Sequence, residues 1–190
     1  MKRLALVLLA ACGGAERPET PRAPTCAGEI VITGEDALAS LAGCRRLDGS
    51  LVIRGGAAFD LTRLDELEVV TGDLTIGPTF ALETITVTGL REVGGAVHVI
   101  SNAAAGGASL PALERAGSLE VAANVDLGRF VAPRLTDVAG DVTIADNPDL
   151  ELLQLGALAR VGGAVSLAAN PNLQVIEIPT ETVDRKNPVP

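Results

Sequence analysis

A motif of glycine followed by two alternating aliphatic residues recurs along the chain at nearly constant spacing. The pattern is Gly-x-φ-x-φ, where φ is an aliphatic residue, and its copies stand 22 or 23 residues apart. Six full copies begin at Gly49, Gly72, Gly95, Gly117, Gly140 and Gly163. A degenerate copy precedes them at Gly28. A fixed period of this length is typical of repeat proteins whose coils stack along one axis.

Aligning the copies on their glycines produces columns of aliphatic residues. The column two residues after the glycine holds Leu51, Leu74, Val97, Leu119, Val142 and Val165. The column four residues after it holds Ile53, Ile76, Val99, Val121, Ile144 and Leu167. This alternation predicts a short strand with one buried face in every coil. No coil can bury its apolar residues alone, so the sequence predicts a mainly β fold, a right-handed parallel β-solenoid of about six to seven coils over residues 26–178.

Seven residues after the glycine, the last four coils carry an asparagine. These residues are Asn102, Asn124, Asn147 and Asn170. An amide at a sharp corner can donate to and accept from the turn backbone of its own coil and of the next. We therefore expect a structural asparagine ladder, with a ligand-binding row of amides as the alternative.

The two ends of such a stack need separate coverage. At the amino end, Thr33 and Asp36 have capping-box spacing and precede the apolar residues 37–41, which predicts a short capping helix closed by Gly43. At the carboxyl end, residues 179–190 form a polar tail without a helix signal. That end is expected to be poorly covered, which leaves open a weak homodimer through the C-terminal end of the solenoid.

Residues 1–11 have the features of an export signal. Lys2 and Arg3 precede an apolar run that is too short to span a bilayer, and a small-residue cleavage site follows. The segment Leu-Ala-Ala-Cys that ends at Cys12 resembles a bacterial lipobox, which implies lipidation of Cys12 and attachment to a membrane. The alternative is an ordinary secretory signal with an incidental cysteine. Residues 12–25 then form a lipidated cysteine and a Pro-rich tether.

This interpretation of the leader places the protein in the cell envelope, with the outer membrane favoured if the host is Gram-negative. Cys26 and Cys44 remain as an even pair in a compartment that permits disulfides, and we expect them to be bonded. Two free thiols or a metal site are the alternatives. Two cysteines and the single His98 cannot complete a four-ligand shell, so no metal or other cofactor is expected.

The amino-acid composition argues against several classes of binding partner for this protein. The chain has 24 acidic and 15 basic residues, a formal net charge of −9, and its basic residues form no patch in the sequence, so no nucleic acid is expected. Aromatic residues are limited to three phenylalanines, which provide no stacking platform for glycans. The acidic turn from Asp146 to Asp149 lacks the repeated pattern of calcium-binding solenoids.

Several of these features together resemble one family. Cys26, a strand, a short helix and Cys44 are followed by the segment from Leu47 to Ile53, which reads LDGSLVI, and later by the Asn-Pro-x-Leu segments that end at Leu150 and Leu173. This order resembles the receptor L domain, the leucine-rich-repeat-like β-helix of insulin-receptor and epidermal-growth-factor-receptor ectodomains and of many bacterial surface proteins. The resemblance covers residues 26–178 and implies the architecture and a general binding role, without specific binding residues.

One outward row of the predicted sheet offers candidate chemistry. Since the columns two and four residues after each glycine face inward, the residue between them faces outward. The candidate binding face is therefore Thr75, His98, Glu120, Thr143 and Ser166. An ordinary solvated sheet face is the alternative. His98 beside Glu120 also suggests a general acid–base pair, but no nucleophile with a supporting motif accompanies it.

The resulting hypothesis is a membrane-anchored, non-enzymatic lipoprotein of the surface or envelope. Its L-domain-like solenoid would serve as a module that binds an unidentified protein or peptide. The alternative is a passive structural or self-associating component of the envelope.

Overall fold

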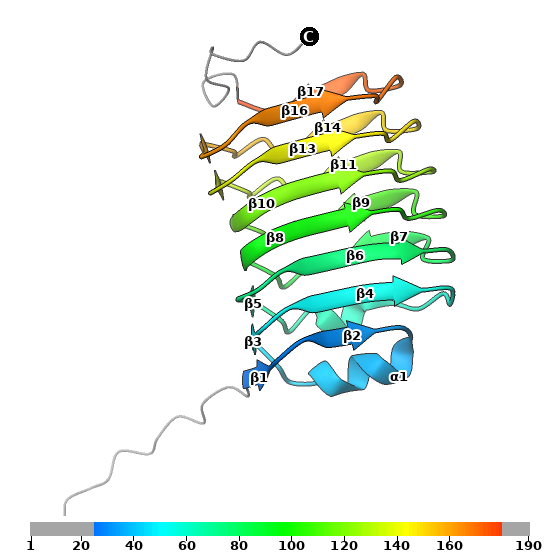
Figure 1. Ribbon diagram of the computed structural model, residues 1–190, viewed down its shortest axis with the longest axis vertical. Helices are drawn as coiled ribbons and strands as arrows, with labels where there is room; N and C mark the ends of the chain where they lie inside the picture. The colour runs from blue at the N-terminus through cyan, green and yellow to red at the C-terminus, as the bar shows by residue number, and fades with distance from the viewer. Residues whose placement is uncertain (1–24, 180–190) are drawn as a thin grey trace, which may run out of the picture.

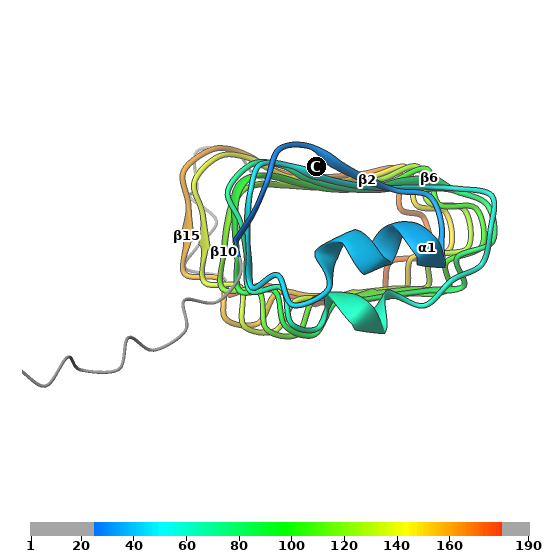
Figure 2. The ribbon, with the colours of Figure 1, turned by 90° about the horizontal axis from the view of Figure 1, so that it is seen from below.

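The chain winds into a parallel β-solenoid of about seven coils, as the 23-residue period predicts (Figure 1). The computed structural model describes residues 25–179. The predictions for the signal segment, Cys12, the tether before Thr25 and the tail after Pro179 lie outside these residues. Seen along the axis, the coils superimpose as a flattened, nearly rectangular outline (Figure 2).

Two bands of one 12-stranded sheet form two adjacent sides of this outline. The long strands β8 (Glu92–Ile100) and β10 (Arg115–Ala122) run through both bands. The first band adds β1 (Thr25–Ala27), β3 (Arg46–Asp48), β5 (Val69–Val70), β12 (Asp137–Val138) and β15 (Arg160–Val161). The second band adds β2 (Ile30–Ile32), β4 (Leu51–Gly55), β6 (Leu74–Thr79), β13 (Val142–Ala145) and β16 (Val165–Ala168).

A five-stranded sheet, here called the short sheet, lies opposite the second band. It consists of β7 (Thr84–Thr86), β9 (Gly107–Ser109), β11 (Arg129–Val131), β14 (Leu152–Gln154) and β17 (Val175–Glu177). In the early coils this side holds no strand. There the chain forms α1 (Glu35–Leu38), η1 (Ala39–Leu41) and η2 (Leu61–Leu64) instead, and α1 lies inside the outline seen in Figure 2.

The core follows the columns that the sequence predicts. Leu51, Leu74 and Val97 pair in register on successive strands, and the inward residues of the second band from Leu51 to Ile144 are at most 1% exposed. On the short sheet, the small Ala108 stands beside the large Phe130, both buried. Every coil therefore completes the burial of its neighbours.

The repeated glycine is required by a close approach of the backbone where the chain bends between the two bands. A Cβ atom at Gly95 would lie 2.8 Å from the carbonyl carbon of Gly72. A Cβ atom at Gly117 would lie 2.5 Å from the carbonyl oxygen of Gly95. Any side chain at these positions would push adjacent coils apart.

The asparagines form a continuous buried ladder at the far end of the second band. The Asn102 Nδ2 donates to the Ile76 carbonyl at 3.1 Å and to the Asn124 Oδ1 at 2.9 Å, and the same oxygen accepts from the Asn102 backbone N–H. Asn124 repeats these bonds toward Val99 and Asn147. Asn102, Asn124 and Asn147 are fully buried, which supports the structural interpretation over a ligand-binding row.

Two details of this corner were not expected from the sequence. The residue before each asparagine adopts a left-handed conformation, with φ of 55° at Ala123 and 52° at Ala169. In the coil that begins at Gly72, Thr79 occupies the asparagine position, and its hydroxyl donates to the Asn102 Oδ1 at 2.7 Å. Thr79 therefore ends the ladder with a smaller side chain.

The amino end of the core is covered, but not by the expected helix. Instead of a helix over residues 37–41 there is one turn of α-helix, Glu35–Leu38, followed by the 3-10 turn Ala39–Leu41. The N-cap is Gly34 and makes no side-chain cap bond, so the predicted capping box is absent. The tighter turn has a physical reason: residues three apart align in a 3-10 helix, so Leu38 and Leu41 both reach the core.

The Cys26–Cys44 disulfide fixes this covered end. The two Cα atoms are 5.9 Å apart, and the bond joins β1 to Cys44, three residues after the end of η1. At the carboxyl end, the aliphatic residues of the last coil remain partly or fully exposed, as the sequence predicts.

Candidate functional site

The candidate binding residues lie side by side on the outer surface of the second band. Successive strands place them in register in one row, which we call the polar row. It runs through Val52, Thr75, His98, Glu120, Thr143 and Ser166. All are partly exposed except Ser166, which is exposed on the last coil. The structure therefore brings together all five residues that the sequence selects for this face.

The rows on either side of the polar row differ from it. On one side, Asp73 and Asp141 accept hydrogen bonds from the backbone N–H groups of Ala96 and Ala164, at 2.8 Å and 2.7 Å, so their carboxylates stabilise the bend between the bands. On the other side stand small or aliphatic residues, Ile100, Ala122, Ala145 and Ala168. The surface is therefore a flat polar strip beside an apolar one.

Within the polar row, His98 and Glu120 are joined by a side-chain hydrogen bond. The His98 Nδ1 lies 2.7 Å from the Glu120 Oε2, and the two side chains are 31% and 42% exposed. Thr75 is the register neighbour of His98 on its other side, but no hydrogen bond joins their side chains in the described chain. The pair is thus an accessible hydrogen-bonding centre.

The polar row lies on the outer face of the second band. Three hollows of about 410, 450 and 290 Å³ occur elsewhere, the first two at the early coils and the third beside β12 and β15. No residue of the polar row lines them. Because small-molecule sites are concave, this geometry favours a broad contact with a macromolecule.

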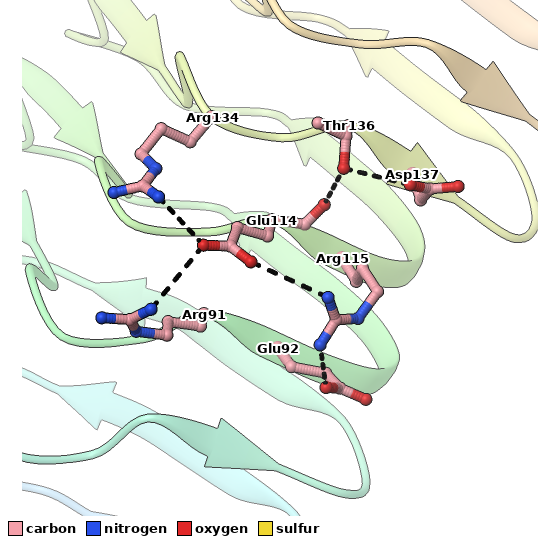
Figure 3. Close-up of polar contacts among 7 residues, drawn as sticks. All are labelled: Arg91, Glu92, Glu114, Arg115, Arg134, Thr136 and Asp137. Carbon is pink, nitrogen blue, oxygen red and sulfur yellow. Dashed lines mark hydrogen bonds and ion pairs between the residues drawn. The ribbon is translucent and has the colours of Figure 1, made fainter.

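A network of opposite charges covers the outside of the first band (Figure 3). Glu92, Arg115, Asp137 and Arg160 follow one another in register on β8, β10, β12 and β15. The Arg115 guanidinium lies 2.5 Å from the Glu92 carboxylate, and Arg160 is bonded to Asp137. We call these four residues the charged column.

A second line of charge runs beside the charged column. Glu114 lies 3.1 Å from Arg134, 3.7 Å from Arg115 and 3.9 Å from Arg91. Sequence reasoning missed this network because it treated the basic residues as dispersed. The signal was present in the repeat: Arg91-Glu92 and Glu114-Arg115 stand just before the same aliphatic column, with opposite signs in successive coils.

The ion pairs within the charged column shift the pKa values of its own members. The hydrogen bond from Arg160 holds the pKa of Asp137 below its ordinary value, with further help from the Thr136 hydroxyl. The hydrogen bond to Glu92 raises the pKa of Arg115, and that to Asp137 raises the pKa of Arg160. Both cations of the charged column, Arg115 and Arg160, therefore have an anionic partner within it.

Within residues 25–179, no group of three or more His, Cys, Asp and Glu side chains is arranged to hold a metal ion. No helix in this part of the chain has the length and hydropathy needed to span a membrane.

Comparison with known proteins adds no relative. No family model matches the chain, and neither the curated proteins nor the solved structures contain a match to it.

Proposed function

We propose that this protein is a lipid-anchored, non-enzymatic module of the cell envelope that binds a protein or peptide through the polar row. Two lines of support come from the sequence. The lipobox-like segment before Cys12 favours acylation and membrane attachment. The order of cysteines, strand and Asn-Pro-x-Leu segments resembles receptor L domains, a family of binding modules.

The observation that carries the proposal is the contrast between the polar row and the other polar surfaces. The carboxylates of Asp73 and Asp141 bond to their own backbone, and the charged column neutralises itself. In the polar row, Thr75 and Thr143 make no recorded side-chain bond among the described residues, and His98 and Glu120 keep accessible surface. Their remaining hydrogen-bonding capacity is available to a partner.

The alternative function, a passive or self-associating envelope component, has support from a different region. Within the described chain the last coil leaves aliphatic residues exposed, such as Val175 and Ile176, which favours contact between copies. The two functions use different surfaces and can be tested separately.

The polar row is tested by photo-crosslinking on intact cells, with a photoreactive residue introduced in place of Ala145. A partner should be captured by the otherwise native chain and lost when Thr75, His98, Glu120 and Thr143 are all replaced by Ala. The matched control replaces the outward short-sheet residues Thr86, Ser109, Val131 and Gln154 by Ala. Exposed substitutions cost about 0.5 kcal/mol or less each, so both variants should fold. Equal capture by all three proteins would contradict the proposal.

The anchor is tested by fractionation. The Cys12→Ser variant should move from the membrane fraction to the soluble fraction and should lose incorporation of labelled fatty acid. Retention in the membrane with unchanged labelling would contradict lipidation at Cys12.

A further inference from the structure

The last coil exposes the interior of the solenoid. Its inward residues are Val161, Val165, Leu167, Leu173, Ile176 and Ile178, which we call the open end. Ile176 is 50% exposed, whereas Leu153, its register partner one coil earlier, is 0% exposed. The same contrast holds for Leu167 and its fully buried partner Ile144. The open end is therefore a cross-section of the core without a covering layer in the described chain.

The open end also presents strand edges that are unpaired within residues 25–179. In a parallel strand, the backbone groups of alternate residues point to opposite neighbours. The Ala164 and Ala168 carbonyls accept from the backbone N–H groups of Val142 and Asp146, so the backbone groups of Val165 and Leu167 point away from β13. On β17, the Glu177 carbonyl accepts from the Leu155 N–H, so the backbone groups of Ile176 point away from β14. A covering partner must supply strand edges as well as apolar surface.

The strand edges of the open end carry few of the charged residues that usually prevent such edges from pairing with another chain. Residues 159–179 contain two charged side chains, Arg160 and Glu177, and both are bonded to the preceding coil, at Asp137 and Gln154. The coil before it carries five acidic residues, Asp137, Asp141, Asp146, Asp149 and Glu151. Edge strands of monomeric proteins usually carry charges that oppose pairing, and this coil has none that is unpartnered in the described chain.

The amino end cannot serve as the complementary surface. Leu38 and Leu41 are at most 2% exposed, and Glu35 and Asp36 of α1 are exposed on this end (Figure 2). Head-to-tail stacking would therefore place the apolar open end against a covered, acidic one. Two open ends, in contrast, match each other in apolar character and in strand edges.

We propose that two copies of this chain associate through their open ends about a two-fold axis. The axis makes the contact self-complementary and runs β16 antiparallel to its counterpart, a pairing that strand edges accept. Both covered ends then face outward, so assembly stops at two copies. This contact does not involve a partner of the polar row. It is independent of the binding function proposed for that row, and it specifies the self-association named there as the alternative.

Sedimentation equilibrium of the purified full-length chain tests the association in the absence of any other protein. The Cys12→Ser form is used so that no acyl group contributes. The chain should show twice its 19.3 kDa mass at high concentration. Ile176→Lys should weaken the dimer by a factor of about 30 or more, because it places an unpaired charge in the contact. The control Val125→Lys changes an apolar residue that is 54% exposed and remote from the open end, and it should have no effect.

Short-range cysteine crosslinking, also in the Cys12→Ser form, then defines the geometry and does not depend on the folding of the lysine variant. Ser166→Cys on the last coil should crosslink to itself, whereas Val31→Cys on the first coil should not. A monomer at all concentrations would overturn the proposal. Crosslinking only in a mixture of the two cysteine variants would overturn it in favour of head-to-tail stacking.

Discussion

The two ends of the solenoid are built from the same kinds of residue but differ in burial. At the amino end, Leu38, Leu41 and Cys44 are buried although no coil precedes them in the described chain. At the carboxyl end, Leu167 and Ile176 occupy columns that are buried in every earlier coil, and both have accessible surface. The difference lies in what covers each end: a crosslinked turn at the first, and nothing in the described chain at the second.

This comparison shows that the burial of an inward residue in a repeat protein depends on the adjacent coil as much as on the residue itself. An aliphatic side chain at an inward position contributes to stability only if another coil lies on each side of it. The contribution of one column should therefore fall from the interior of the stack toward the open end. Three measurements test or sharpen this gradient.

The largest effect is expected from the asparagine ladder. Asn124→Ala would leave the Asn102 backbone N–H without its partner in the interior and would remove the side-chain bond to the Val99 carbonyl, at a cost of about 4 kcal/mol. Asn170→Ala removes the same bonds beside the open end, where water can replace them, at about 1 kcal/mol. Urea unfolding of the two variants measures the difference, and equal losses would contradict a gradient.

A smaller effect is expected from the crosslink at the covered end. Replacing Cys26 and Cys44 together by Ala should lower the free energy of unfolding by about 3 kcal/mol, because the bond closes a loop of 18 residues in the unfolded chain. Amide exchange should accelerate in β1, β2 and α1 and stay unchanged in β16. A uniform acceleration over all coils would show that the covered end does not act as a separate unit.

The smallest effect concerns the ion pair that joins the last coil to the rest. Arg160 lowers the pKa of Asp137 in the folded protein, so this carboxylate stabilises the fold above its unfolded pKa, and that contribution is lost as the pH falls through its folded pKa. Arg160→Gln should raise the pKa of Asp137 toward its ordinary value, as measured by NMR titration. Arg134→Gln, which removes a partner of Glu114, should leave that pKa unchanged. A high salt concentration should reduce the effect of Arg160.

Much of the fold follows from the period alone. Once the glycines are aligned, Leu51, Leu74 and Val97 must share one column, and a column of aliphatic residues in a stack of coils must face inward. The same register places Thr75, His98 and Glu120 side by side on the outer surface. A strand has only two faces, so these assignments required no knowledge of the turns.

The features that the sequence did not reveal depend on turns and long side chains. Thr33 and Asp36 match a capping box, but the chain enters α1 through Gly34, and the pattern cannot show this path. The left-handed conformation of Ala123 is imposed by the corner and contradicts the preference of alanine. The charged column required comparing charges between coils, because Arg115 and Glu92 are neighbours in space and 23 residues apart in sequence.

The regular register of the second band also sets the length of the molecule in discrete steps. Each coil advances the chain by one strand spacing, about 4.8 Å, so the rise from β2 to β16 is about 29 Å. Inserting or deleting one 23-residue coil would change that length by one step and leave every remaining side chain on the same face. The number of coils therefore sets the distance between a surface on the last coil and β1, in multiples of one strand spacing.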